Sequence, residues 1–159
     1  AGNDQLIFDS NELESGEVGV VHFSGGSDFD VLVVGNDNQS QMIDMSNNTF
    51  QEIEGVKISS SDTELALALD KIAANNTAGD TAGQFVCTGA SSIDVSGWGW
   101  QLTESHLEMS ESLQDIYRES NIDTGSLYGY RFESEAGQEV VIWSDLNSGD
   151  INFPDTNEV

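Results

Sequence analysis

The stretch GQFVCTGASSIDVSGWGWQLT, residues 83–103, holds two of the three tryptophans and the only cysteine of the 159-residue chain. Its apolar positions recur every second residue, at Phe85, Cys87, Ile93 and Val95. Alternation with a period of two is typical of strands that bury one face and expose the other. We therefore expect this stretch to supply the central strands of the core.

The phase of this alternation changes at Gly97, after which Trp98, Trp100 and Leu102 are the apolar positions. A shift of one residue within a strand is typical of a β-bulge or of a crossing between sheets. The pattern predicts that Trp98 and Trp100 point to the same, buried side of one strand.

Further runs of β-branched and apolar residues predict strands on both sides of this stretch. Residues 17–23 and 29–34 flank a Gly-Gly pair, which supplies the positive φ of a hairpin loop, and they predict a hairpin. Two short strands are expected at 41–45 and 49–58, and a second hairpin at 126–134 and 138–144.

Two capping boxes predict helices. Ser61-Asp62-Thr63-Glu64 precedes apolar residues spaced for one helical face and predicts a helix over 62–75, and Ser105 with Glu108 predicts another over 106–119. The connections between strands have hairpin lengths and show no regular βαβ alternation. This pattern indicates an α+β fold, mainly antiparallel β (a sandwich or a sheet), with one or two packed helices.

We expect one acidic domain over residues 1–159 with distinctive ends. Residues 1–13 and 145–159 are polar segments that carry isolated apolar groups. The first segment is predicted to be an arm and the second a polar tail, both suited to ordering against a neighbouring subunit.

The charge of the chain is strongly negative, with 29 acidic against 4 basic residues and a formal net charge of −25. Such a surface repels phosphate backbones and anionic lipid, so we expect no direct nucleic-acid binding and no membrane insertion. The 37% hydrophobic content indicates a folded chain and not a disordered acidic tail. A halophilic or marine source explains the charge best, and mimicry of nucleic acid is the alternative.

Motifs for catalysis, nucleotides and transition metals do not stand out. There is no G-x-S-x-G or phosphate-binding loop in the sequence. Cys87, His22, His106 and Met109 are ligand types of a blue-copper site, but their spacing does not fit one. Helical spacing is found at Glu104, Glu108, Glu111 and Asp115, for which a solvated face is the favoured interpretation.

One segment and one hairpin carry candidate binding residues. Asp145, Asn147 and Asp150 have spacing that resembles a calcium loop, although Gly149 occupies the third ligand position and no Glu closes the loop. We therefore expect no cofactor, with calcium at these three residues as the alternative. A sugar-binding or protein-docking face is one interpretation of the aromatic residues Tyr128, Tyr130, Phe132 and Trp143, although alternating aromatic residues more often lie half in the core and half on the surface.

The sequence predicts a non-catalytic structural protein, a self-assembling β-rich subunit of a virion or of an extracellular surface assembly from a saline habitat. Its expected partners are further copies of itself or other structural subunits. Alternatives are a nucleic-acid-mimicking inhibitor, an acidic carbohydrate- or calcium-binding module, and a halophilic enzyme without a known motif. The cytoplasm is the alternative location.

Overall fold

The described strands of this chain form three sheets, and the chain passes repeatedly from one sheet to the next. The computed structural model describes residues 5–8, 23–24, 28–34, 41–46, 50–59, 62–75 and 81–154. A seven-stranded sheet has the order β1-β3-β6-β8-β12-β11-β10, a four-stranded sheet has the order β13-β9-β7-β4, and β2 pairs with β5. The strands are β1 (Gln5–Phe8), β2 (Phe23–Ser24), β3 (Val31–Val34), β4 (Gln41–Asp44), β5 (Phe50–Gln51), β6 (Gly55–Ile58), β7 (Thr63–Ala68), β8 (Gln84–Thr88), β9 (Ser92–Ser96), β10 (Trp100–Leu107), β11 (Tyr128–Ser134), β12 (Glu139–Ser144) and β13 (Ile151–Asn152).

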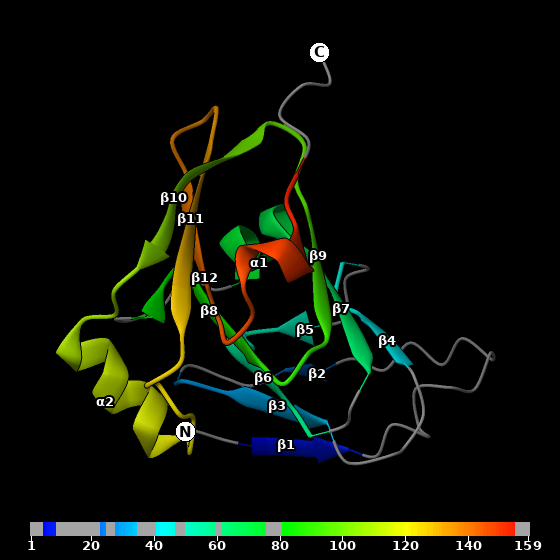
Figure 1. Cartoon of the computed structure of the whole chain (residues 1–159), viewed down its shortest axis with the longest axis vertical. Helices are drawn as coiled ribbons and strands as arrows, with labels where there is room; N and C mark the ends of the chain where they lie inside the picture. Colours follow the sequence, from blue (N-terminus) through cyan, green and yellow to red (C-terminus); the bar gives the residue numbers. More distant parts are fainter. Residues whose placement is uncertain are drawn as a thin grey trace.

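The chain contributes strands to these sheets in a repeating order, and each passage through the sheets forms one turn of the fold. β2, β3 and β4 lie in the three different sheets, and β5, β6 and β7 repeat the same order in the next layer. β8 with β9, and finally β12 with β13, repeat the last two places (Figure 1). Because each turn adds one strand to the same sheet in the same direction, the ladders between turns are parallel. This is the arrangement of a short parallel β-helix.

Equivalent residues of successive turns stack in rows. In the four-stranded sheet, Ile43 pairs with Leu65, Leu65 with Ile93, and Ile93 with Ile151. All four side chains are buried. Each turn therefore covers the apolar residues of the turn before it, which is how a solenoid builds one continuous core.

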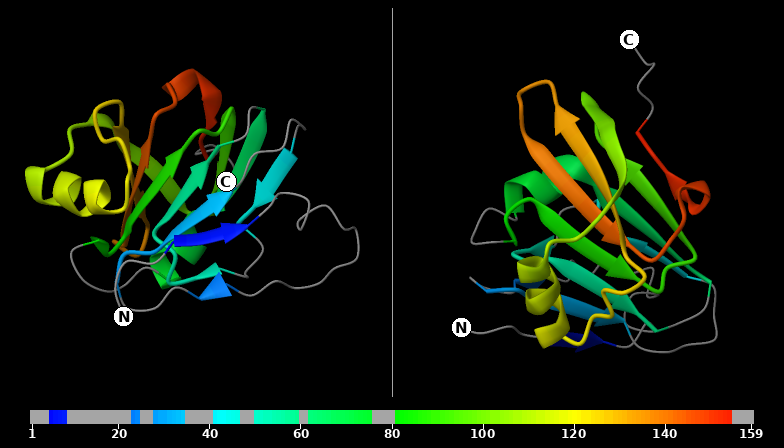
Figure 2. Two further views of the ribbon diagram at one scale, coloured as in Figure 1. Left: turned by 90° about the horizontal axis from the view of Figure 1, so that it is seen from below. Right: turned by 60° about the vertical axis from the view of Figure 1, so that its left-hand side comes forward.

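The middle strands of the seven-stranded sheet, β3, β6, β8 and β12, are buried on both faces. Leu32 and Val56 face the inner core between the sheets, whereas Val31 and Val86 belong to a second cluster with Leu113. Leu113 lies on helix α2 (Glu111–Glu119), which packs against the outside of this sheet (Figure 2). Burial on both faces explains the unbroken apolar run of Val31–Val34.

An insertion extends the last turn. β10, α2 and β11 lie between β9 and β12 in the chain, and β11 pairs antiparallel with both β10 and β12. Helix α1 (Leu69–Asn75) enters the third turn between β7 and β8 and places Leu69 in the inner core. Its Asp70 accepts a hydrogen bond of 2.7 Å from the indole Nε1 of Trp100.

The pairing differs from the expected one. Both kinds of element, strands and helices, are present as predicted, but antiparallel ladders are confined to β10–β11 and β11–β12 among the described strands. The second hairpin is confirmed by the pairing of β11 with β12. The first hairpin is wrong for the residues that are described, because residues 31–34 pair as β3 with β1 and β6, while Phe23 lies in β2, which pairs with β5 in another sheet; residues 17–22 lie outside the described ones. Corners between the sheets of a β-helix use the same small polar residues as hairpin turns, so composition does not separate the two.

Both predicted helices begin too early. Thr63–Ala68 is strand β7, and the first helix starts at Leu69. Leu65 and Leu67 are buried while Glu64 is exposed, so the period of two prevails over the helical spacing. The second helix starts at Glu111 and is capped by the hydroxyl of Ser110, because strand β10 continues to Leu107.

The two tryptophans and the chain ends also depart from expectation. Trp100 begins β10 and is 2% exposed, whereas Trp98 lies in the preceding turn and is 86% exposed. The predicted arm includes β1, which pairs with β3 of its own sheet. The predicted tail includes β13, where Ile151 is buried. Of the predicted arm and tail, residues 1–4, 9–13 and 155–159 lie outside the described ones. Among the described residues, no helix is long and apolar enough to cross a membrane.

Candidate functional site

Two buried carboxylic acids lie one above the other on neighbouring turns of the β-helix. Asp30 precedes β3 and Glu54 precedes β6, and their side chains are buried, Asp30 completely. The backbone N–H of Asp30 donates to Glu54 Oε2 at 2.7 Å, and the backbone N–H of Glu54 donates to the carbonyl oxygen of Asp30 at 2.9 Å. These two hydrogen bonds fix the positions of the two acids relative to each other.

Burial raises the pKa of Glu54 from 4.5 to about 7. The hydrogen bond from the backbone of Asp30 lowers this pKa in part, and the negative charges of Asp30 and Glu52 raise it further. Glu54 therefore gains or loses its proton near neutral pH, whereas an exposed glutamate is fully ionised there.

Helix α2 places Tyr117 next to this acid pair. The ring of Tyr117 is fully buried and packs against Phe29, with 4.9 Å between the ring centroids. Burial raises the pKa of Tyr117, and the charges of Cys87 and Glu54 raise it further. The tyrosine hydroxyl has no hydrogen-bond partner among the described residues. Tyr117 therefore keeps its proton over the pH range in which Glu54 titrates.

A carboxylic acid with a pKa near 7 is the kind of group that serves in general acid–base catalysis. Such a group must come within hydrogen-bond reach of a substrate, and Glu54 is only 5% exposed. The acid pair can therefore respond to pH, but in this conformation it cannot touch a substrate.

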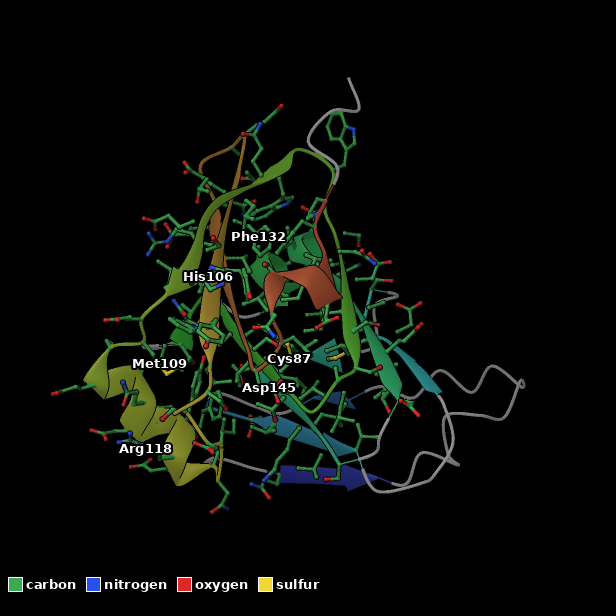
Figure 3. The ribbon with its side chains drawn as sticks, viewed as in Figure 1. Cys87, His106, Met109, Arg118, Phe132 and Asp145 are labelled. Carbon is green, nitrogen blue, oxygen red and sulfur yellow. The ribbon has the colours of Figure 1, made fainter. Side chains whose placement is uncertain are left out.

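The side chains considered for copper are not brought together. Cys87 is fully buried on β8, where burial raises the pKa of its thiol to about 12. His106 is exposed on β10, and Met109 lies on the connection from β10 to α2, where it packs in the cluster around α2 (Figure 3). His22 lies outside the described residues. The described part of the chain contains no group of three or more His, Cys, Asp or Glu side chains that could hold a metal.

The calcium candidates lie on the path from β12 to β13. Both carboxylate oxygens of Asp145 accept from the backbone N–H of Gly89, at 3.3 and 3.2 Å. Asn147 occupies the N-cap position of the short 3-10 helix η3 (Ser148–Asp150) without a side-chain capping hydrogen bond, and Asp150 is the last residue of η3. Asp145 thus ties the last turn to the corner between β8 and β9, and calcium binding by the three residues remains a prediction.

The predicted acidic helix face does not form. Glu104 lies on β10, Glu108 precedes α2, and only Glu111 and Asp115 lie on the helix. Glu104 instead forms an ion pair with Arg131 of the neighbouring strand.

The predicted aromatic face is divided between two cores. Tyr130 and Phe132 belong to the inner core, and Trp143 belongs to the cluster under α2. Tyr128 is 41% exposed, and its ring lies 5.4 Å from that of His106. A sugar-binding face built from all four aromatic residues is therefore wrong.

Sequence reasoning missed two features. The Asp30–Glu54 pair gave no local signal, because its members come together only through the stacking of turns. Trp98 did carry a signal, since glycines on both sides of it are typical of a turn.

Comparisons with protein-family models, with curated proteins and with solved structures found no match.

Proposed function

We propose that this chain is a non-catalytic structural subunit of a virion or of an extracellular surface assembly that works in a saline habitat. The observation that carries this proposal is the burial of three titratable groups in the described part of the chain. Glu54, Cys87 and Tyr117 have strongly raised pKa values, and each side chain is buried. Groups that solvent does not reach support the packing of a scaffold and do not process a substrate.

The distribution of charge supports function in salt. Arg131 pairs with Glu104 and Glu139, and Arg118 lies 3.8 Å from Asp115. With 29 acidic and 4 basic residues, most carboxylates have no cation of the chain to pair with. Dissolved salt screens the repulsion between such groups, and two copies approach each other more easily as the Debye length shrinks.

The two ends of the seven-stranded sheet support an assembly role. At one end, β10 has two register shifts along its pairing with β11, and bulges of this kind discourage further strand pairing. At the other end, β1 pairs with β3, and no described strand lies along its opposite edge. We infer that copies of the chain associate through β1, at this edge of the seven-stranded sheet.

Sedimentation velocity in NaCl from about 0.1 M to about 2 M tests this proposal. We expect larger species as the salt concentration rises. Gln5→Lys adds a positive charge to an exposed position of β1, and a charged lysine on an edge strand hinders pairing, so this variant should assemble less. Gln101→Lys makes the same change at an exposed position of β10 and serves as the matched control. A chain that stays monomeric in every salt concentration, or equal effects of both variants, would refute the proposal.

A further inference from the structure

Trp98 is a large apolar side chain that the fold leaves in solvent. It is 86% exposed, although Trp100, two residues later, is 2% exposed. Aromatic side chains dominate the energetics of protein interfaces, and tryptophan is among the residues most enriched at their centres. A single exposed tryptophan is not sufficient to define a contact, so its setting decides the interpretation.

The turn that carries Trp98 is fixed on both sides. The backbone N–H of Trp100 donates to the carbonyl oxygen of Gly97 at 3.3 Å, and the indole of Trp100 is held by Asp70. A β-carbon on Gly97 would lie 2.9 Å from Trp100 Cδ1 and 3.0 Å from Leu69 Cδ1, so the backbone packs tightly there. The backbone around Trp98 is thus already ordered, which lowers the entropy cost of binding.

A carboxylate lies beside this turn. The tip of the β11–β12 hairpin meets the turn where the backbone N–H of Glu135 donates to the carbonyl oxygen of Gly99 at 3.1 Å. The side chain of Glu135 also approaches Gly99, since a β-carbon there would lie 4.0 Å from Glu135 Cδ. Figure 1 shows the connection from β9 to β10 and the tip of the hairpin at the same end of the molecule.

An exposed indole whose neighbouring residue, Gly99, is approached by a carboxylate suits a guanidinium group. Arginine stacks on aromatic faces by cation–π attraction, and its planar donors also bind carboxylates. We propose that Trp98 and Glu135 form a docking point for an arginine-bearing segment of a cationic partner protein. This inference names one partner of the structural subunit proposed above.

The charges of the chain argue that this partner is a different protein. Arg118 interacts with Asp115 and Gln114, and Arg131 interacts with Glu104 and Glu139. A second copy would thus have to break existing contacts to offer an arginine. A cationic protein can offer its arginines freely, and its positive charge is complementary to the net charge of −25.

Binding of a fluorescently labelled hexa-arginine peptide to the intact chain tests the proposal. The measurement is made by anisotropy in about 0.5 M NaCl, where the screening length of about 4 Å suppresses non-specific attraction to the acidic surface. We expect Trp98→Ala to weaken binding about threefold to thirtyfold, the range that corresponds to a cation–π contact. Glu135→Gln should also weaken binding.

Tyr128→Ala is the matched control, because Tyr128 is the other large aromatic side chain that is exposed among the described residues. It should leave peptide binding unchanged. Equal affinities of the wild type and Trp98→Ala, or equal losses in Trp98→Ala and Tyr128→Ala, would overturn the docking point. This outcome is independent of self-association, since a chain that remains monomeric in salt can still bind the peptide at Trp98.

Discussion

Substitution of Glu54 by glutamine isolates the energetic effect of the buried acid pair. Glutamine keeps the size of the side chain and an oxygen that accepts from the backbone N–H of Asp30, but it carries no charge at any pH. The variant therefore removes the cost of ionising a buried group and leaves the packing under α2 intact.

The size and the sign of the effect follow from the pKa. Folding raises the pKa of Glu54 from 4.5 to about 7, so the native state binds this proton more tightly than the unfolded state does. The stabilisation is complete below about pH 4.5 and is lost as the pH rises through about 7. At about 1.4 kcal/mol for each unit of pKa, the loss is about 3 kcal/mol, a large part of a typical free energy of unfolding.

Urea denaturation of the wild type and of Glu54→Gln between pH 4.5 and pH 8 measures this loss, because the lower limit is the unfolded pKa and the upper lies above the folded one. The two proteins should be about equally stable at the acidic end, and the variant should be more stable at pH 8. Glu64→Gln, which removes an exposed carboxylate of β7, is the control for the loss of one charge. A difference between wild type and Glu54→Gln that does not change with pH would refute the reasoning.

Three further predictions test the core, the saline habitat and the calcium loop. Trp100→Ala should lower the free energy of unfolding in urea by about 3–5 kcal/mol, whereas Trp98→Ala should change it by about 0.5 kcal/mol or less; similar losses would contradict the placement of the two side chains. The thermal midpoint measured by circular dichroism should rise between about 0.01 M and about 2 M NaCl, and a flat midpoint would contradict a saline habitat. Micromolar calcium should raise the midpoint beyond NaCl of equal ionic strength if Asp145, Asn147 and Asp150 bind it, and Asp145→Ala should abolish that gain; no gain in the wild type would remove the calcium site.

Local patterns predicted the strands better than they predicted the pairing. The alternation of Phe85, Cys87, Ile93 and Val95 marks positions that are all buried, and the hairpin of β11 and β12 follows from one short turn. Each parallel ladder joins residues of different turns, such as Leu65 and Ile93, which no local period connects. The boundary between β7 and α1 was also predicted wrongly. Leu69 continues the apolar alternation of the strand and is at the same time the first residue of the helix, so the sequence pattern does not show where one ends and the other begins.

The candidate site was harder to predict than the fold. Asp30 and Glu54 are 24 positions apart, and each follows an apolar residue. Nothing in the local sequence distinguishes them from the many other acidic residues of the chain. Their burial depends on the stacking of β3 on β6 and on the seating of Tyr117 from α2. The exposure of Trp98 depends on where β10 begins, and element boundaries are the least certain part of a sequence-based prediction.

The buried acid pair and the acidic surface both make this protein less stable as the pH rises, but salt separates them. Repulsion between exposed carboxylates is screened when the Debye length falls from about 30 Å at 0.01 M to about 3 Å at 1 M salt. The cost of ionising Glu54 arises mainly from burial, which dissolved ions do not reach. In the wild type, the slope of stability against pH should therefore shrink with salt down to a residual part that Glu54→Gln lacks. If high salt removes the whole slope in the wild type, surface repulsion is its only source, and Glu54 then has no special role in the response to pH.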